Sequence, residues 1–232
     1  MLYIVSTPIG NLKDITLRAL ETLKLVDLIA AEDTRHTKIL LDAYDIHKPL
    51  TSFFEHNENQ KTEYLIGLMK EGKNIALVSD AGTPGIADPG YPLIRAAQEA
   101  GIKVEVIPGV TALIMALTGS GLPMHSFIFE GFLPAKSTGR RNKLAEFKGE
   151  KRTVIFYESP HRILKTLKDI AEVLDDPMVV CCRELTKKFE EVKKGPATEL
   201  LQHFTHHTPK GEFVVLINKG QTPISKGQTP IS

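Results

Sequence analysis

The segment S-D-A-G-T-P-G-I-A-D-P-G, from Ser79 to Gly90, holds more glycine, proline and aspartate than a plain turn requires. Pro84 and Pro89 restrict φ and remove N–H donors, whereas the glycines leave the main chain open to close approach. Such a loop can present fixed backbone groups to a small polar ligand. Asp80 could accept hydrogen bonds from a ribose diol or an amino group. An Asx-turn role is the alternative for Asp80, and an equally good one for Asp88.

Two other loops have a related composition. The segment S-T-P-I-G-N-L, from Ser6 to Leu12, contains Gly10, which permits a close backbone approach or a positive φ. The segment I-P-G-V-T-A, from Ile107 to Ala112, ends where Thr111 either caps a helix or contacts a ligand. No loop matches G-x-x-x-x-G-K-[ST] or a strict G-x-G-x-x-G, so the motifs give no support for a phosphate-cradling nucleotide site.

Positive charge is concentrated in one stretch. The chain has 29 Lys or Arg against 28 Asp or Glu, so its net charge of +1 neither attracts nor repels a polyanion. The stretch from Lys136 to Arg152 is nevertheless rich in basic residues, among them Arg140 and Arg141. This pattern indicates either a phosphate footprint or an ordinary solubilising loop.

The segment E-D-T-R-H-T, from Glu32 to Thr37, also carries groups that can contact nucleic acid. Arg35 and His36 are the candidates for a phosphate or a base, while Asp33 or Thr34 would cap a helix. Metal chemistry is not expected. His203, His206 and His207 have no cysteine or carboxylate at ligand spacing, and we interpret them as solvent-facing.

The elements that position these loops follow a repeating pattern in the first half of the chain. Each apolar run is followed by a turn and then by helical spacing, which predicts a mainly parallel sheet covered on both faces. The predicted strands are Leu2 to Val5, Leu28 to Ala31, Ile75 to Val78 and Val104 to Ile107. In an open α/β sheet the ligand lies beyond the carboxyl ends of the strands, where the glycine-rich loops are.

The second half is predicted to be mixed α and β. Its expected strands are Phe127 to Glu130, Thr153 to Tyr157, Met178 to Cys182 and Glu212 to Ile217, with an amphipathic helix from Ile163 to Leu174. The charges from Lys187 to Lys194 predict a solvated face. The chain therefore divides into an α/β domain of residues 1–121, a mixed α/β domain of residues 122–218 and a tail of residues 219–232.

The tail is a perfect repeat of K-G-Q-T-P-I-S, which predicts disorder or an artefact of the sequence. Cys181 and Cys182 are strand neighbours that point to opposite faces, so a disulfide between them is not expected. The N-terminus has no basic leader and the longest apolar stretch is too short to span a bilayer, so we expect a cytoplasmic protein without membrane association.

Six segments together resemble the tetrapyrrole methylase superfamily and, within it, enzymes that methylate small-subunit ribosomal RNA. They are T-P-I-G-N-L, A-E-D-T-R-H-T, S-D-A-G-T-P-G-I-A-D-P-G-Y-P-L, V-I-P-G-V-T-A, Y-E-S-P-H-R-I and R-E-L-T-K-K-F-E-E, and the resemblance runs from Leu2 to about Asn218. It implies two α/β domains of the tetrapyrrole methylase type with S-adenosylmethionine in the cleft between them. It also implies a homodimer that methylates a cytidine ribose 2'-hydroxyl in the decoding region of 16S rRNA, on free RNA or the 30S subunit.

The resemblance also assigns residues. Cofactor contacts would fall on Ile9, Gly10, Asp80, Gly82, Thr83, Pro108, Gly109, Thr111, Ala112 and, from the second domain, Tyr157. Relatives continue past the G-E-F-V-V-L-I strand with a small helical extension, whereas the duplicated heptapeptide follows it here. An RNA-binding role of that extension is therefore not carried over.

The ribose 2'-hydroxyl is weakly acidic, so a side chain that accepts its proton would contribute about 10²- to 10⁴-fold. The candidates at strand ends are His161, Glu158 and Glu184. The structural alternative for the first two is a helix start with Ser159 as N-cap and Pro160 at the first helical position. RNA contacts are expected of Arg35, His36, Arg140, Arg141, Arg162 and Arg183.

Two other functions remain open at this point. A related methylase that acts on a carbon of a tetrapyrrole, such as a cobalamin precursor, would share the Ser79 to Gly90 and Ile107 to Ala112 loops. The segments Y-E-S-P-H-R-I and R-E-L-T-K-K-F-E-E favour the RNA enzyme instead. A non-catalytic RNA-binding protein that kept the fold and lost the reaction is the alternative from another class.

Overall fold

The computed structural model describes residues 1–206 and 209–220 of the chain. It divides into two compact units, Met1–Ala112 and a second unit that begins at Leu113. The sequence placed the domain boundary after Gly121. In the structure, all of helix α5 (Ala112–Ser120) except its first residue belongs to the second unit instead of closing the first. His207 and residues 221–232, which hold nearly all of the predicted tail, lie outside the described residues.

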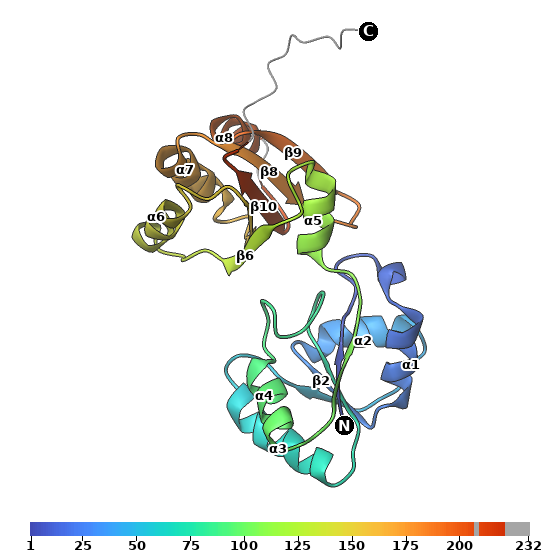
Figure 1. The fold of residues 1–232 in the computed structure, drawn as a ribbon. Coiled ribbons are helices and arrows are strands. Elements are labelled where there is room, and N and C mark those ends of the chain that lie inside the picture. The colour runs from blue at the N-terminus through green and yellow to red at the C-terminus, as the bar shows by residue number, and fades with distance from the viewer. Residues whose placement is uncertain (207–208, 221–232) are drawn as a thin grey trace. The chain divides into compact units, whose positions relative to one another are not determined.

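The first unit is built on a five-stranded parallel sheet (Figure 1). Its strand order is β3-β2-β4-β1-β5, so β1 lies between β4 and β5. The strands are β1 (Leu2–Val5), β2 (Leu28–Ala31), β3 (Leu50–Ser52), β4 (Ile75–Val78) and β5 (Val104–Ile107). The four predicted strands are confirmed at both ends, whereas the short β3 was not predicted.

Helices cover both faces of this sheet. One apolar core packs α1 (Leu17–Leu25) and α2 (Thr34–Ala43) against it through Leu23 and Leu41. The other core packs α3 (Glu58–Lys70) and α4 (Tyr91–Glu99) through Leu65 and Leu93. A single 3-10 turn, η1 (Leu12–Asp14), follows the first loop. Because both faces are covered, the strands are nearly continuous apolar runs, which is the reason that the sequence located them well.

The second unit contains a mixed five-stranded sheet in the order β6-β7-β10-β8-β9. The strands β6 and β7 are parallel, and the other neighbouring pairs are antiparallel. The bounds are β6 (Phe127–Phe132), β7 (Thr153–Glu158), β8 (Met178–Arg183), β9 (Glu191–Pro196) and β10 (Phe213–Asn218). The predicted pair of α/β domains, one mainly parallel and one mixed, is confirmed.

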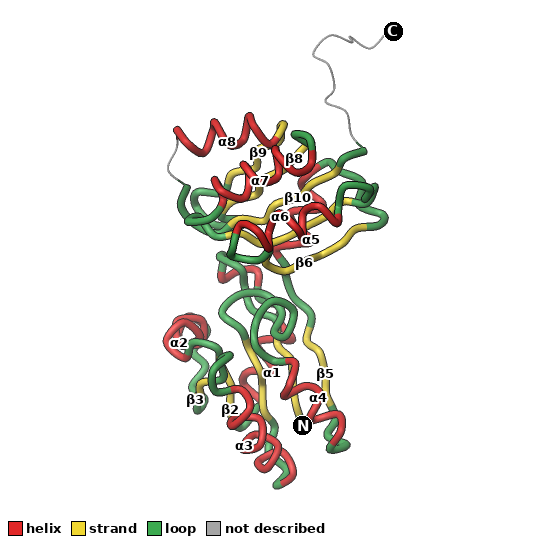
Figure 2. The backbone as a smooth tube through the Cα atoms, turned by 90° about the vertical axis from the view of Figure 1, so that its left-hand side faces the viewer, coloured by secondary structure: helices red, strands yellow, loops and turns green. Residues whose placement is uncertain are grey.

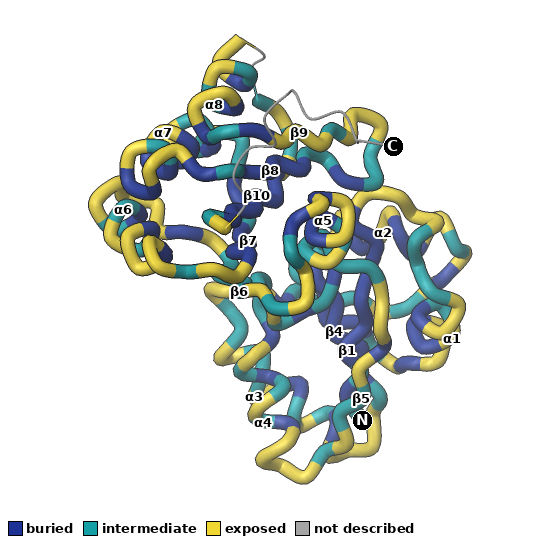
Figure 3. The backbone as a smooth tube through the Cα atoms, turned by 45° about the horizontal axis from the view of Figure 1, so that its top comes forward, coloured by how far each residue is buried: buried dark blue, intermediate teal, exposed yellow. Residues whose placement is uncertain are grey.

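Three helices form a layer on one face of the mixed sheet (Figure 2). They are α6 (Ser137–Glu146), α7 (Ile163–Leu174) and α8 (Ala197–His206), and the predicted bounds of α7 are confirmed. The shared core includes Leu144, Leu167 and Leu200 from these helices and Phe156 and Val215 from the strands. Figure 3 shows the strands β7, β8 and β10 as the most buried part of this unit.

The strand β9 lies at the edge of the sheet and was expected only as a solvated charged segment. Val192, Lys193 and Lys194 in it are exposed, as that expectation requires, but they pair with β8. Charged residues are common on edge strands because they discourage pairing with another chain.

Cys181 and Cys182 on β8 are both buried, and they form no disulfide. Across the described ranges, no helix has the length and apolarity needed to cross a membrane.

Candidate functional site

The loops after β1 and β4 are joined to each other at the carboxyl edge of the parallel sheet. The Thr7 backbone N–H donates to the Gly82 carbonyl oxygen (N···O 2.8 Å), and the Gly82 N–H donates to the Thr7 carbonyl oxygen (3.1 Å). The hydroxyl oxygens of Ser6 and Thr83 lie 2.8 Å apart. The two segments, distant in sequence, therefore form one surface.

The loop after β5 packs directly against the loop after β1. The Ser6 N–H donates to the Ile107 carbonyl oxygen (3.2 Å). A Cβ at Gly109 would lie 2.7 Å from the Cβ of Ser6, so only glycine permits this approach. Gly82 has φ +78, which also favours glycine. The structure thus brings together most of the predicted cofactor residues, namely Ile9, Gly10, Asp80, Gly82, Thr83, Pro108 and Gly109.

Asp80 connects the ends of β4 and β2. Its Oδ1 accepts a hydrogen bond from the Asp33 N–H (3.0 Å), and its own N–H donates to Glu32 Oε2 (3.2 Å). Burial raises the pKa of Glu32 above its ordinary value, and the neighbouring Asp80 carboxylate adds to the effect. Asp80 is therefore held by bonds between strand ends rather than by an Asx-turn of its own.

Thr111 precedes helix α5 but does not cap it. Its Oγ1 is buried and has no hydrogen-bond partner within the part of the chain that the structure describes. An unsatisfied buried hydroxyl costs about 1–3 kcal/mol, so a ligand atom beside it would remove a real penalty. Of the two expected roles of Thr111, the structure argues against the cap and leaves the ligand contact. Ala112, the other candidate here, is the first residue of α5.

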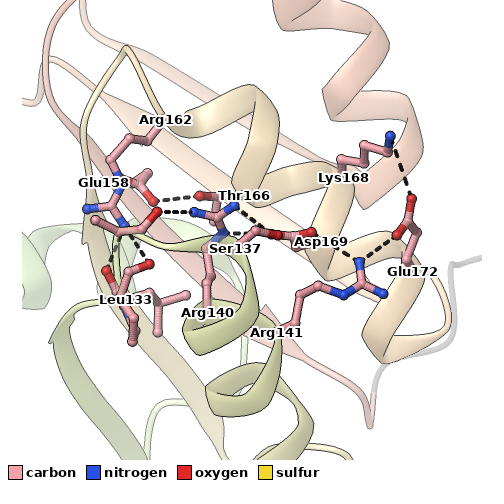
Figure 4. Close-up of polar contacts among 12 residues, drawn as sticks. Leu133, Ser137, Arg140, Arg141, Glu158, Arg162, Thr166, Lys168, Asp169 and Glu172 are labelled. Carbon is pink, nitrogen blue, oxygen red and sulfur yellow. Dashed lines mark hydrogen bonds and ion pairs between the residues drawn. The ribbon is translucent and has the colours of Figure 1, made fainter.

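Glu158, expected as a proton acceptor, is fully buried at the end of β7. Its carboxylate accepts hydrogen bonds from Thr166 Oγ1 (2.6 Å) and the Ser159 N–H (2.8 Å), and it forms an ion pair with Arg162 (3.2 Å). Figure 4 shows these groups between β7 and α7. This burial corrects the expectation, because a carboxylate with no exposed surface does not contact a ribose hydroxyl. Glu158 instead supports the turn that follows it.

That turn carries the second candidate, His161, whose side chain is exposed. The expected helix start at Ser159 is wrong by several residues, because α7 begins at Ile163 with Arg162 at the cap position. The Ser159 carbonyl oxygen accepts hydrogen bonds from the N–H groups of Arg162 and Ile163, both at 3.1 Å. Ser159 to Arg162 therefore form a separate turn that leads into the helix.

The third candidate, Glu184, lies after β8 with φ +51. Its Oε1 accepts hydrogen bonds from Lys187 Nζ (2.9 Å) and from the Glu212 N–H (3.1 Å). Although burial opposes the shift, these bonds lower the pKa of Glu184. Because its carboxylate is already paired with a lysine, Glu184 is a poorer proton acceptor than an unpaired group.

The predicted RNA-binding arginines of the second unit are mostly engaged within the fold. Arg140 is 3% exposed and contacts Asp169 Oδ2 through Nη2 (2.6 Å) and Nε (2.7 Å). This burial argues against a phosphate contact by Arg140, which instead fixes α6 to α7 (Figure 4). The half-exposed Arg141 contacts Asp169 and Glu172. Arg162 donates to the Leu133 carbonyl oxygen (2.6 Å), and Arg183 forms an ion pair with Glu191 (2.9 Å).

The candidates on α2 are exposed. Arg35 forms an ion pair with Asp33 (2.6 Å), and hydrogen bonds from Arg35 lower the pKa of Asp33 well below its ordinary value. Asp33 is the N-cap of α2, as the sequence predicted, and accepts from the Arg35 N–H. His36 is exposed beside it. Both Arg35 and His36 therefore stay available for contact with a polyanion.

Sequence reasoning missed an aromatic cluster on β6 and β7. Tyr157, expected as a cofactor contact, packs edge-to-face against Phe129 (5.1 Å between ring centroids) and Phe132 (5.7 Å). The signal was the glycine inside the strand F-I-F-E-G-F, because an internal glycine often marks a β-bulge.

The solvent-facing interpretation of His203 is also corrected, since its Nε2 lies 3.0 Å from Glu191 Oε1 and its side chain is mostly buried. No group of three or more metal-ligating side chains occurs among residues 1–206 and 209–220.

Comparison with known proteins identifies relatives of the whole fold. A family model of the tetrapyrrole (corrin/porphyrin) methylases matches residues 1–201. Among solved structures, diphthine synthase has a TM-score of 0.75 at 17% identity, with 94% of this chain and 89% of that chain covered. Uroporphyrin-III-C-methyltransferase from Thermus thermophilus has a TM-score of 0.63 at 22% identity, with 94% of each chain covered. At these identities the likeness shows the fold alone.

Curated relatives are much closer in sequence. The protein named ribosomal RNA small subunit methyltransferase I from Escherichia coli O157:H7 is 55% identical over 219 residues, 93% of this chain and 77% of that protein. Its namesake from Thermotoga maritima is 49% identical over 217 residues, 94% of this chain and 97% of that protein. The chain belongs to the tetrapyrrole (corrin/porphyrin) methylase family and, within it, to the ribosomal RNA small subunit methyltransferase I family.

Proposed function

We propose that this protein is an enzyme that uses S-adenosylmethionine to methylate the 2'-hydroxyl of a cytidine in the decoding region of 16S rRNA. The observation that carries the proposal is the identity of about half of all residues with proteins named for methylation of small-subunit rRNA. The resemblance also leads us to propose a cytoplasmic homodimer that acts on the 30S subunit or its RNA.

The loops of the first unit fit the proposed cofactor. Gly10 and Gly109 are exposed, and their backbone groups are accessible to a ligand because no side chain shields them. Thr111 Oγ1 is buried without a partner among the described residues, and a polar atom of the cofactor would satisfy it. Asp80 keeps a second carboxylate oxygen for a ribose diol or an ammonium group, since Oδ1 alone binds Asp33. The contact expected of Tyr157 stays a prediction.

S-adenosylmethionine supplies a methyl group that its sulfonium already activates. The protein's task is therefore to hold the reactants in line, to exclude water and to assist loss of the hydroxyl proton. We assign the last task to His161, because it is the exposed member of the three candidates, whereas Glu158 and Glu184 are engaged in the fold. Arg35 and His36 are proposed to contact RNA phosphates.

The proposal is tested with methyl-labelled cofactor and 30S subunits that lack the modification. The labelled nucleotide should be a 2'-O-methylated cytidine after nuclease digestion, and Asp80→Asn should weaken cofactor binding in calorimetry. Exposed Asp42 on α2 provides the matched control, since Asp42→Asn changes the same group outside the loop cluster.

Other outcomes separate the alternatives. Label on a uroporphyrinogen-type tetrapyrrole, and none on 30S subunits, would show a tetrapyrrole C-methyltransferase. RNA binding without any calorimetric signal for the cofactor would show a non-catalytic RNA-binding protein. Either result would refute the proposed reaction.

A further inference from the structure

The edge strand β6 contains a bulge that changes which face its side chains occupy. Phe129 pairs with Ile155 of β7, a difference of 26 in residue number, whereas Phe132 pairs with Tyr157, a difference of 25. One extra residue is therefore accommodated between Phe129 and Phe132, where Gly131 has φ +60. Because side chains alternate along a strand, an inserted residue reverses the faces of everything after it.

The bulge moves Phe132 off the helix-covered face of the sheet. In the unbroken register Phe132 would pair with Glu158, whose carboxylate points to Thr166 on α7. It lies instead beside Tyr157, and the next residue, Leu133, returns to the helix-covered core. As a result Phe132 is 54% exposed although its strand belongs to a well-packed sheet.

The exposed ring is held firmly in place. The Tyr157 ring contacts the Phe132 ring edge-to-face at an interplanar angle of 63°. The Tyr157 ring also packs edge-to-face against the Phe129 ring, at an interplanar angle of 67°. The chain directly after Phe132 is fixed as well, because Arg162 donates to the carbonyl oxygens of Leu133 (2.6 Å) and Pro134 (3.3 Å). Glu158 pairs with Arg162 in turn (Figure 4). A large apolar ring is thus exposed at a point where a neighbouring ring and the following backbone are both held by contacts.

Positive charge accompanies the ring. Lys136 is exposed at the start of α6, at most roughly 14 Å of chain from Phe132. Within the described residues it forms no ion pair. Phe132 is therefore followed, within four residues, by a cation that is unpaired in the described chain. Proteins bind single-stranded RNA with exposed rings that stack on bases and cations that meet phosphates.

We propose that Phe132 is a stacking platform for an unpaired nucleobase of the RNA substrate, braced by Tyr157 and held by the Glu158–Arg162 pair. This inference rests on the proposed function, because it takes the substrate to be RNA. Phe132 is a substrate-binding residue, and Arg162 is a positioning residue that acts through the backbone of Leu133 and Pro134.

The chain contains no tryptophan, so Phe132→Trp introduces a unique fluorophore at the platform. The probes are a short oligocytidylate, a matched oligomer of abasic riboses, and S-adenosylmethionine alone. We expect saturable quenching of the indole emission by oligocytidylate only. Val106→Trp is the control, because Val106 is 58% exposed on β5 beside the acidic Glu105 and should show no saturable quenching by oligocytidylate.

Kinetics provide a second readout. Phe132→Leu keeps apolar volume but loses the ring, and we expect its KM for 30S subunits to rise about 10-fold or more, on the scale of one lost stacking contact. Its kcat and its affinity for the cofactor should stay unchanged, and Phe132→Tyr should restore KM. Arg162→Lys should raise KM in the same direction, because one ammonium group cannot contact both the Glu158 carboxylate and the two carbonyls, as Nε and Nη2 of the guanidinium do.

Equal quenching by the abasic oligomer, or quenching by the cofactor alone, would overturn the stacking proposal. So would a normal KM in Phe132→Leu. If the wild-type protein transfers no methyl group to 30S subunits, the proposed function fails. The quenching experiment still decides the inference in that case, because it needs no turnover.

Discussion

His161 and Glu158 occupy one turn of the second unit but have opposite surroundings. Glu158 has no exposed surface and accepts hydrogen bonds from Thr166 and from the backbone of Ser159. His161 projects from the same turn into solvent. The two side chains of this turn therefore differ: that of Glu158 supports the backbone, and that of His161 is exposed to solvent.

We predict that His161→Ala lowers methyl transfer to 30S subunits by about 10²- to 10⁴-fold, the range for a lost proton acceptor. Calorimetric affinity for S-adenosylmethionine should not change. His125→Ala is the matched control, because His125 is also exposed and lies outside the turn. Turnover of His161→Ala within two-fold of wild type would remove His161 from the mechanism.

Glu32 gives a pH-dependent prediction. Burial raises its pKa above the ordinary value of about 4.5, so the folded state binds this proton more tightly than the unfolded state. Its contribution to stability is therefore greatest below about pH 4.5 and is lost as pH rises through the raised pKa. The neutral Glu32→Gln variant keeps an acceptor for the Asp80 N–H but carries no such proton.

The unfolding free energy of Glu32→Gln relative to wild type should thus increase from pH 4 toward pH 7, as measured by urea titration at each pH. Glu21→Gln, a change at an exposed position of α1, serves as the control. A relative stability that falls over the same interval would mean that the carboxylate of Glu32 is stabilised, not penalised, in the fold.

At the scale of elements, one buried ion pair couples α6 to α7. Arg140 and Asp169 are both nearly inaccessible, and removal of one member of such a pair leaves a buried charge. We predict that Arg140→Met lowers the unfolding free energy by about 3 kcal/mol, the lower end of the usual range, because Arg141 and Ser137 still contact Asp169. Denaturant unfolding of the two proteins measures the difference.

Arg141→Met is the matched control for this pair, and its loss should be much smaller because solvent screens its half-exposed charge. The double variant Arg140→Met, Asp169→Leu should recover part of the loss, since it removes both buried charges. Equal losses in the two single arginine variants would contradict the assignment of Arg140 as the coupling residue. An Arg140→Ala, Arg141→Ala double variant is accordingly a poor probe of RNA binding.

The strands β1, β2, β4 and β5 of the first unit could be read from the sequence, because apolar runs mark strands of a sheet that is covered on both faces. Two of the four edge strands, β3 and β9, could not be predicted in this way. β3 is the three-residue L-T-S, and β9 is the charged E-V-K-K-G-P, whose exposed side chains have the composition of a loop. Exposed edge strands are defined by backbone pairing with a neighbour, which leaves little trace in composition.

The candidate site likewise has parts that the sequence predicted and parts that it did not. The glycine-rich loops were found because backbone conformations such as that of Gly82 restrict the residue type. The burial of Glu158 and Arg140 was missed, since charged residues are usually exposed and their partners are fixed only by the fold. Asp169, the partner of Arg140, lies 29 positions away on another helix. Pairings of this kind are determined by the tertiary structure and cannot be read from the spacing of residues in the sequence.

At the scale of the whole molecule, the balance of charge requires that attraction to RNA be local. The net charge is +1, and four of the basic residues between Lys136 and Arg152 form ion pairs, namely Arg140, Arg141, Lys143 and Arg152. Hydrogen bonds from Arg152 lower the pKa of its partner Glu150 to about 2, so this pair persists across physiological pH. The stretch thus offers an RNA backbone far fewer cations than its sequence suggests.

Lys136 and Lys148 test which part of this surface meets RNA. They flank α6, whose ten residues span roughly 15 Å, and both are exposed without an ion pair in the described chain. If RNA crosses the end of the sheet at Phe132, Lys136→Ala should reduce the log–log salt slope of RNA binding by about one unit. Lys148→Ala should leave the slope unchanged, because that lysine lies at the other end of the helix. Equal reductions would mean that the RNA runs along α6, and no reduction in either variant would identify the stretch as a solubilising surface.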